Sequence, residues 1–240
     1  MRILIALLTS LTLAAQQPTT LNYHVEWRLV HAGDVRLRWQ PLPNSPTAGD
    51  ADLHLETVGL VAKLFKVDNN YRTKMAEGYC SLSSAMDIQE PNRRRQTQVI
   101  YDREKKRAFF LERDLVKNAQ VGNADVETPG CVHDVVAGLM ALQKQKLQPG
   151  QSLTVPISDG KKFANVRIDA QEKETVKTPA GNFSAIRHEV MLMNGVIYNR
   201  SGRVFIWLTD DDRRLPVQFR IRLQILVGTV TLQLAKEEHP

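Results

Sequence analysis

Apolar and polar residues alternate along almost the whole chain, and this period of two constrains the fold more than any other feature. Residues 21–29 and 217–223 show the pattern most clearly. Because successive side chains of a strand point to opposite faces of a sheet, each such segment predicts a strand with one buried face. About a dozen such segments follow one another, separated by turn residues such as Asn194-Gly195. The sequence therefore predicts antiparallel strands joined in chain order.

One stretch breaks the alternation. Cys131–Leu147 carries its apolar residues at the spacing of a helix. Asp134 is suited to cap this helix, because a short carboxylate can accept hydrogen bonds from the first free backbone amides. Lys144 and Lys146 would lie in the last turn, where positive charge suits the helix dipole. We expect one helix over about residues 133–147, packed against the sheet or across its open end.

The 240-residue chain contains no internal repeat and no shift in composition, which indicates a single domain. We expect one β-rich domain over residues 21–235, between a short disordered lead at 16–20 and a frayed tail at 236–240. Residues 116–129 are polar and aperiodic, which predicts a loop. So many strands in one sheet must curl or split to bury a face. The expected fold is all-β: an antiparallel meander curled into an open barrel or β-roll, with the helix against it.

The N-terminal 15 residues are typical of a secretory signal peptide. Arg2 precedes a short apolar run that ends in small residues, which predicts cleavage after Ala15. The run is shorter than the ~20 residues of a membrane-spanning helix; the alternative is a buried N-terminal helix. We expect an exported protein, periplasmic or extracellular. The net charge of +6 favours loose attraction to anionic surfaces, while export argues against nucleic acid as the partner.

Cys80 and Cys131 are the two cysteines of the chain. In an oxidising compartment two cysteines usually pair, so we predict a disulfide between them. A free nucleophilic thiol is the alternative. The chain-entropy model values a loop of this length at about 4 kcal/mol at most.

An apolar run over residues 58–65 lacks a strict period of two. It would either drop into the core or form an exposed apolar lip, and such patches often mark binding surfaces. The residues of this candidate ligand or partner surface are Val58, Leu60, Val61, Leu64 and Phe65.

Several groups of basic residues are candidates for contact with anionic envelope material, such as lipid head groups or acidic glycans. Acidic residues lie among them, so solvated sheet faces are the alternative. The candidate residues are Arg93, Arg94, Arg95, Arg220 and Arg222.

Other polar groups do not predict a reaction. His133-Asp134 is more typical of a helix entry than of a catalytic pair, because a base needs an oriented nucleophile within reach. The histidines lack ligand spacing, and the triple aspartate at 210–212 resembles a solvated turn, so no metal site is expected. Without a phosphate-binding glycine loop, no cofactor is expected. We predict no catalytic residues.

Short motifs follow one another in a fixed order through most of the chain. They are Tyr23-x-Val25-x-Trp27, Ala32-Gly33, Val132-His133-Asp134, Leu147-x-Pro149-Gly150, Lys177-Thr178-Pro179-x-Gly181-x-Phe183, Ile206-Trp207-Leu208-Thr209-x-Asp211, Arg213-Arg214-Leu215-Pro216-Val217 and Gly228-x-Val230-x-Leu232. Together these motifs resemble a bacterial family of exported proteins, domain of unknown function 3108. The resemblance covers roughly residues 20–234 and implies an exported, β-rich fold without an assigned activity.

Three functions stay open at this point. The first is a non-enzymatic binding protein of the cell envelope, whose curled sheet holds an apolar or amphiphilic, lipid-like ligand. The second is a structural or partner-docking module of an envelope complex that uses a basic sheet face or a sheet edge, with peripheral membrane contact allowed. The third is a hydrolase with an unrecognised site.

Overall fold

The computed structural model describes residues 17–192, 202–223 and 228–239. The expected signal peptide and the expected turn at Asn194-Gly195 lie outside these ranges. All strands of the described residues belong to one antiparallel sheet of 14 strands. This confirms the all-β meander, with more strands than the sequence pattern indicates.

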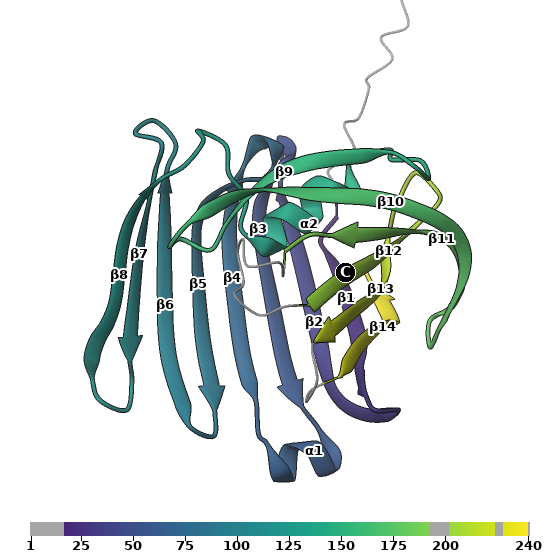
Figure 1. Ribbon diagram of the computed structural model, residues 1–240, viewed down its shortest axis with the longest axis horizontal. Coiled ribbons are helices and arrows are strands. Elements are labelled where there is room, and N and C mark those ends of the chain that lie inside the picture. The colour runs from purple at the N-terminus through teal and green to yellow at the C-terminus, as the bar shows by residue number, and fades with distance from the viewer. Residues whose placement is uncertain (1–16, 193–201, 224–227, 240) are drawn as a thin grey trace, which may run out of the picture.

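The sheet consists of two meanders (Figure 1). The first contains β1 (Thr19–Trp27), β2 (Val30–Leu42), β3 (Ser45–Thr57), β4 (Asp68–Ala76), β5 (Cys80–Glu90), β6 (Arg93–Asp102), β7 (Arg107–Asp114) and β8 (Ala119–Glu127). The second contains β9 (Ser152–Ser158), β10 (Phe163–Thr178), β11 (Gly181–Val190), β12 (Gly202–Thr209), β13 (Pro216–Leu223) and β14 (Thr229–Glu238). Pairing of β1 with β14 joins the two meanders, so β8 and β9 form the edges of the described sheet.

In the described part of the chain, two helices and one 3₁₀ turn interrupt the strands: α1 (Gly59–Leu64), η1 (Glu77–Tyr79) and α2 (Val135–Gln143). The sheet curls, and α2 lies within the curl between the two meanders (Figure 1). One apolar cluster joins Val136, Ala137 and Met140 of α2 to buried residues of β1 and β2. A second cluster joins Leu142 to buried residues of β9–β12. The helix therefore packs against both meanders and covers part of the space inside the curl.

The helix is shorter than the expected span of 133–147. The backbone N–H of Lys144 donates to the carbonyl of Ala141, and that of Gln145 donates to Leu142. These bonds span three residues, so the last turn tightens and the α-helix ends at Gln143. Lys146 lies beyond the helix and pairs with Asp212 at 2.9 Å.

The prediction of a loop over residues 116–129 is wrong, because β8 occupies most of this segment. Every residue of β8 is exposed or half-buried, and the strand pairs with β7 alone. An edge strand with little burial needs no apolar alternation, so its sequence resembles a loop. The sheet also extends beyond the expected domain limits of residues 21 and 235, since Thr20 of β1 pairs with Glu238 of β14. Residues 19–20 and 236–238 are therefore part of the sheet.

Candidate functional site

Asp134 fixes the N-terminus of α2. One carboxylate oxygen accepts the backbone N–H groups of Val136 and Ala137 at 2.9 and 3.0 Å. The other accepts the hydroxyls of Thr73 and Ser81 at 2.5 and 2.7 Å. The side chain is therefore both the predicted helix cap and a link to β4 and β5. Because both hydroxyls donate to this carboxylate, the group acts as an anchor.

The entry to α2 is also covalently attached. In the structure a disulfide joins Cys131 to Cys80 at the start of β5, with the two Cα atoms 5.0 Å apart. His133 is buried, and its Nδ1 donates to the carbonyl of Tyr79 at 2.8 Å. Burial lowers the pKa of His133, which favours the neutral ring. His133 also forms a parallel bridge with Ile157 of β9, so this entry segment connects the two meanders.

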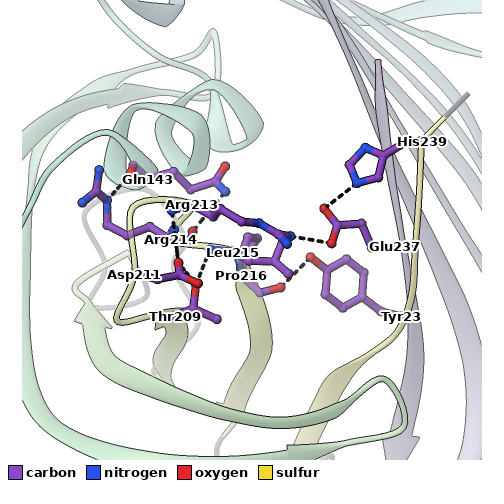
Figure 2. A network of polar contacts seen from close by, with 10 residues as sticks. All are labelled: Tyr23, Gln143, Thr209, Asp211, Arg213, Arg214, Leu215, Pro216, Glu237 and His239. Carbon is purple, nitrogen blue, oxygen red and sulfur yellow. Dashed lines mark hydrogen bonds and ion pairs between the residues drawn. The ribbon is translucent and has the colours of Figure 1, made fainter. Parts of the chain in front are cut away.

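The other end of α2 is attached to the β12–β13 turn. Arg214 Nε donates to the carbonyl of Gln143 at 2.5 Å, and the Gln143 side chain donates back to the carbonyl of Arg214 at 3.2 Å (Figure 2). Asp211 holds the turn, since it accepts the Thr209 hydroxyl at 2.7 Å and the backbone N–H groups of Arg213 and Arg214. The triple aspartate thus supplies a turn, as the sequence indicates.

The same network continues to the first and last strands. Tyr23 of β1 donates its hydroxyl to the carbonyl of Pro216 at 2.8 Å (Figure 2). Glu237 of β14 pairs with Arg213 and with His239. We call this side of the molecule the closed end, because polar contacts attach α2 to the sheet there.

A cavity of about 470 Å³ lies between α2 and the curled sheet. Its walls come from α2, β1–β3 and β9–β14, so both meanders contribute. Among the lining residues Tyr23 carries the one polar side-chain atom, and that hydroxyl donates to Pro216. Representative lining residues are Leu37, Leu53, Leu139, Val166, Ile206 and Phe219. The volume falls within the range of about 300–1,000 Å³ that is usual for small-molecule sites.

The cavity extends toward the end of the sheet opposite the closed end. Val190, Val204 and Leu223 line it, and they lie where β11 ends, β12 begins and β13 ends. The β1–β2 turn and α1 lie at this same end, because β14 begins beside the end of β1 and α1 follows the end of β3. We call this side the rim.

Side chains at the rim include several exposed apolar ones. In α1 no residue is buried, and Leu60 and Leu64 are 67% and 77% exposed. Phe65 is 50% exposed, and Leu29 in the β1–β2 turn is 90% exposed. The run at 58–65 is therefore not part of the core, contrary to one of the two expectations. It also does not line the cavity. We call the exposed residues Leu29, Leu60, Leu64 and Phe65 the lip.

The first group of predicted anionic contacts begins β6. Arg93 pairs with Glu112 at 3.5 Å, and Arg95 pairs with Asp114 at 3.2 Å, both across the β6–β7 pair. Arg94 is exposed. These ion pairs make two of the three arginines less available to an external anion.

The second group lies on β13, on the outer face of the sheet. The guanidinium of Arg220 lies 5.1 Å from the ring centroid of Trp207, and that of Arg222 lies 5.4 Å from that of Phe205. Both rings are almost fully buried. Within the described ranges no carboxylate lies within ion-pair distance of either arginine. The two side chains therefore cover aromatic surface and keep their charge available.

The sequence does not identify the cavity residues as a site. Leu139 of α2, Leu53 of β3 and Ile206 of β12 each fit the ordinary pattern of a buried face. A core position and a cavity wall have the same periodicity, and only the distance across the curl separates them. The sequence gives one signal for an enclosed space, which is the expected combination of many strands with a single large helix.

Of the two solved structures compared below, the first, with a TM-score above 0.5, supports the fold. A β-barrel-like protein of domain of unknown function DUF1849 from Brucella abortus aligns with a TM-score of 0.61 at 6% identity, over 95% of this chain and 99% of that one. A DUF1089 family protein from Pseudomonas aeruginosa aligns with a TM-score of 0.37 at 10% identity, over 90% and 95% of the two chains.

Sequence comparison identifies the family. No curated protein matches the chain. Among the described residues no helix is long and apolar enough to cross a bilayer. Residues 22–235 match the family described as "Protein of unknown function (DUF3108)". The match covers nearly all of the sheet, from β1 to β14, and the chain belongs to this family.

Proposed function

We propose that this protein is an exported binding protein, without a reaction of its own, that holds the apolar chain of a lipid-like molecule in the cavity beneath α2. The observation that carries the proposal is the composition of the cavity wall, which among the described residues is hydrocarbon apart from one tyrosine hydroxyl. That hydroxyl already donates to a backbone carbonyl. The interior therefore suits an acyl or isoprenoid chain, and a polar head group would remain at the rim.

The lip supports the same proposal. Exposed leucine and phenylalanine side chains stand at the end toward which the cavity extends. Such side chains would lower the cost of moving an apolar chain between a membrane surface and the cavity, since less hydrocarbon would meet water on the way. Export is supported by the signal-like N-terminus and by the paired cysteines, because disulfides persist in oxidising compartments.

Binding of cis-parinaric acid, a fluorescent fatty acid, tests the proposal. Val204→Phe would fill the cavity near the rim, where Val204 is half-buried. Val121→Phe on β8 is the matched control, because Val121 is 44% exposed and remote from the lining. We expect wild type and V121F to bind the probe and V204F to bind about tenfold more weakly or worse. Equal binding by all three proteins, or no binding by wild type, would contradict the proposal.

A second candidate function is docking to an anionic partner in the envelope. It is favoured by Arg220 and Arg222, whose charges are available on the outer face of β13. Retention on anionic vesicles should then fall as the salt concentration rises, because screening weakens exposed charges. The double variant R220Q/R222Q should lose this retention, whereas R93Q/R95Q should keep it. Cavity filling at Val204 should not affect it.

A further inference from the structure

The outer face of the β1–β2 hairpin brings together two histidines and an aspartate that are not adjacent in sequence. His31 Nε2 lies 2.9 Å from Asp34 Oδ1, and His24 Nε2 lies 4.0 Å from the same oxygen. The imidazole rings are stacked, with centroids 4.6 Å apart and planes 28° from parallel. One ligand atom from each residue lies within 4.8 Å of the others. Three atoms that can bind a metal therefore lie close together on one face.

A β-bulge creates this arrangement. In a regular strand residues 31 and 34 would point to opposite faces, because their separation is odd. Here Val25 pairs with Gly33, whereas Glu26 pairs with His31, so β2 contains one extra residue at Ala32. Ala32 and Gly33 are both buried, and His31 and Asp34 consequently share the outer face. Asp34 then lies directly opposite His24.

The bulge is held by a close contact with the neighbouring strand. A Cβ atom on Gly33 would lie 2.3 Å from the backbone carbonyl oxygen of Glu56 in β3. Only glycine allows this approach, which keeps β2 kinked at the point where it turns His31 outward. The geometry of the three side chains thus depends on the packed backbone and not on flexible side chains alone.

We propose that His24, His31 and Asp34 form a binding site for a divalent first-row transition-metal ion such as Zn²⁺. Two imidazole nitrogens and one carboxylate oxygen are a usual donor set for zinc, and imidazole also suits copper and nickel. The three side chains are 50%, 47% and 41% exposed, so an ion can reach them from solvent. Small rotations of the stacked rings would bring the donor atoms to the separations of a tetrahedral site.

The remaining coordination positions are available to water or to a neighbouring carboxylate. Glu26 is the cross-strand partner of His31 and the second residue along from His24. Its register places it on the outer face beside the three proposed ligands. The site lies next to the β1–β2 turn at the rim, but it shares no residue with the cavity lining. Metal binding can therefore be tested without reference to lipid binding.

Calorimetric titration of the untagged, oxidised chain from residue 16 onward with ZnCl₂ tests the site. We expect one ion per wild-type chain, with affinity about tenfold weaker or worse in His31→Gln and in Asp34→Asn. His54→Gln is the matched control, because His54 Nε2 lies 3.0 Å from Asp68 Oδ1 in a pair without a second histidine. This variant should bind Zn²⁺ like wild type.

A spectroscopic readout distinguishes coordination from weak surface attraction. Co²⁺ bound by the wild-type chain should give the visible absorption of a site with nitrogen and oxygen ligands, and H31Q should lose it. Circular dichroism should show that the exposed substitutions leave the fold intact. No saturable Zn²⁺ binding by wild type would overturn the proposal. An equal loss in H54Q and H31Q would overturn it as well, since binding would then not depend on the cluster.

Discussion

The two α-helices of the described chain differ in almost every contact that they make. α2 has five buried residues, an aspartate cap and polar attachments at both ends. α1 has six residues, none of them buried, and Val58 at its N-cap position provides no side-chain hydrogen bond. Both helices are rich in apolar residues, yet one packs inside the curl and the other exposes its leucines. Apolar composition alone therefore does not determine burial in this fold.

The difference follows from the side-chain contacts and the disulfide that attach α2 to the sheet. A helix of nine residues is unstable by itself, so packing and capping must hold α2 in position. Asp134, the Cys80–Cys131 disulfide and Arg214 hold it at defined points, and its apolar face then forms one wall of the cavity. α1 has a backbone bond from Val58 N–H to Ala32 but no side-chain bond at its N-cap. At its C-cap the exposed hydroxyl of Thr57 donates to the carbonyl of Phe65 at 3.1 Å, with no buried carboxylate or disulfide behind it. Substitutions in the two helices should therefore have very different consequences.

The largest expected effect is that of Asp134→Ala. The substitution removes the cap and leaves the buried hydroxyl of Ser81 without its acceptor. Thr73 loses its short bond to the carboxylate and keeps a longer one to the carbonyl of Ser83, at 3.3 Å. We expect the free energy of unfolding to fall by about 3–5 kcal/mol in urea titrations. Asp212→Ala is the matched control, because this carboxylate is 92% exposed and should leave the unfolding midpoint near that of wild type. Equal losses in both variants would mean that Asp134 does not anchor α2.

Removal of the disulfide should have the next largest effect. The double variant C80S/C131S frees a loop with a sequence separation of 51. We expect a loss of about 2–4 kcal/mol, chiefly because the unfolded chain gains freedom. Urea unfolding of wild type with a reductant should match the variant. A variant as stable as oxidised wild type would show that the covalent link to α2 is dispensable.

A smaller effect should appear as a dependence on pH. Burial lowers the pKa of His133, at the entry to α2, below that of a free histidine. The unfolded chain therefore takes up a proton near pH 6.5 that the folded chain does not, so stability should decrease as the pH falls below about 6.5. Burial lowers the pKa of His188 in the same way and adds to the slope.

Substitution isolates the contribution of His133. The side-chain amide in His133→Asn can still donate to Tyr79 but does not titrate. The slope of unfolding free energy against pH should therefore be shallower in H133N than in wild type. The exposed His31→Asn serves as a control for the general effect of removing a histidine. An unchanged slope in H133N would exclude the α2 entry as a source of the pH dependence.

The smallest effect on stability is expected for α1. Leu64→Ala should change the unfolding free energy by less than about 0.5 kcal/mol, because Leu64 is 77% exposed. The same substitution at Leu142 of α2, which is 1% exposed, should cost about 2–5 kcal/mol. L64A should nevertheless reduce cosedimentation with phosphatidylethanolamine–phosphatidylglycerol vesicles if the lip contacts membranes. Similar stability losses at both leucines would remove the contrast between the helices.

The sequence predicts the general architecture well where local pattern and tertiary environment agree. The strand over residues 217–223 has one apolar face that lines the cavity, and its alternation is correspondingly regular. Asp134 is identified as a cap because its role depends on the next few backbone amides. β8 is missed because an edge strand buries too little surface to require an apolar pattern.

The sequence predicts much less about the two proposed binding sites, the metal cluster and the cavity. His24 and Asp34 are cross-strand partners, and His31 joins them only because an extra residue changes the register of β2. A search for ligand spacing along the chain cannot detect this, because the spacing is set by hydrogen bonds between strands. The residues of the cavity wall are missed for a related reason, since the opposite walls are contributed by residues such as Leu53 and Ile206 that are far apart in sequence.

Local sequence therefore determines which segments are strands, where α2 begins and which cysteines are available to pair, because these properties depend on neighbouring residues and on composition. The tertiary structure alone decides that α2 ends at Gln143, that residues 58–65 are exposed and that a hydrocarbon-lined space remains beneath the helix. Each of these depends on which distant groups meet after the sheet has curled. Periodicity specifies the face on which a side chain lies, whereas packing specifies what lies opposite that face.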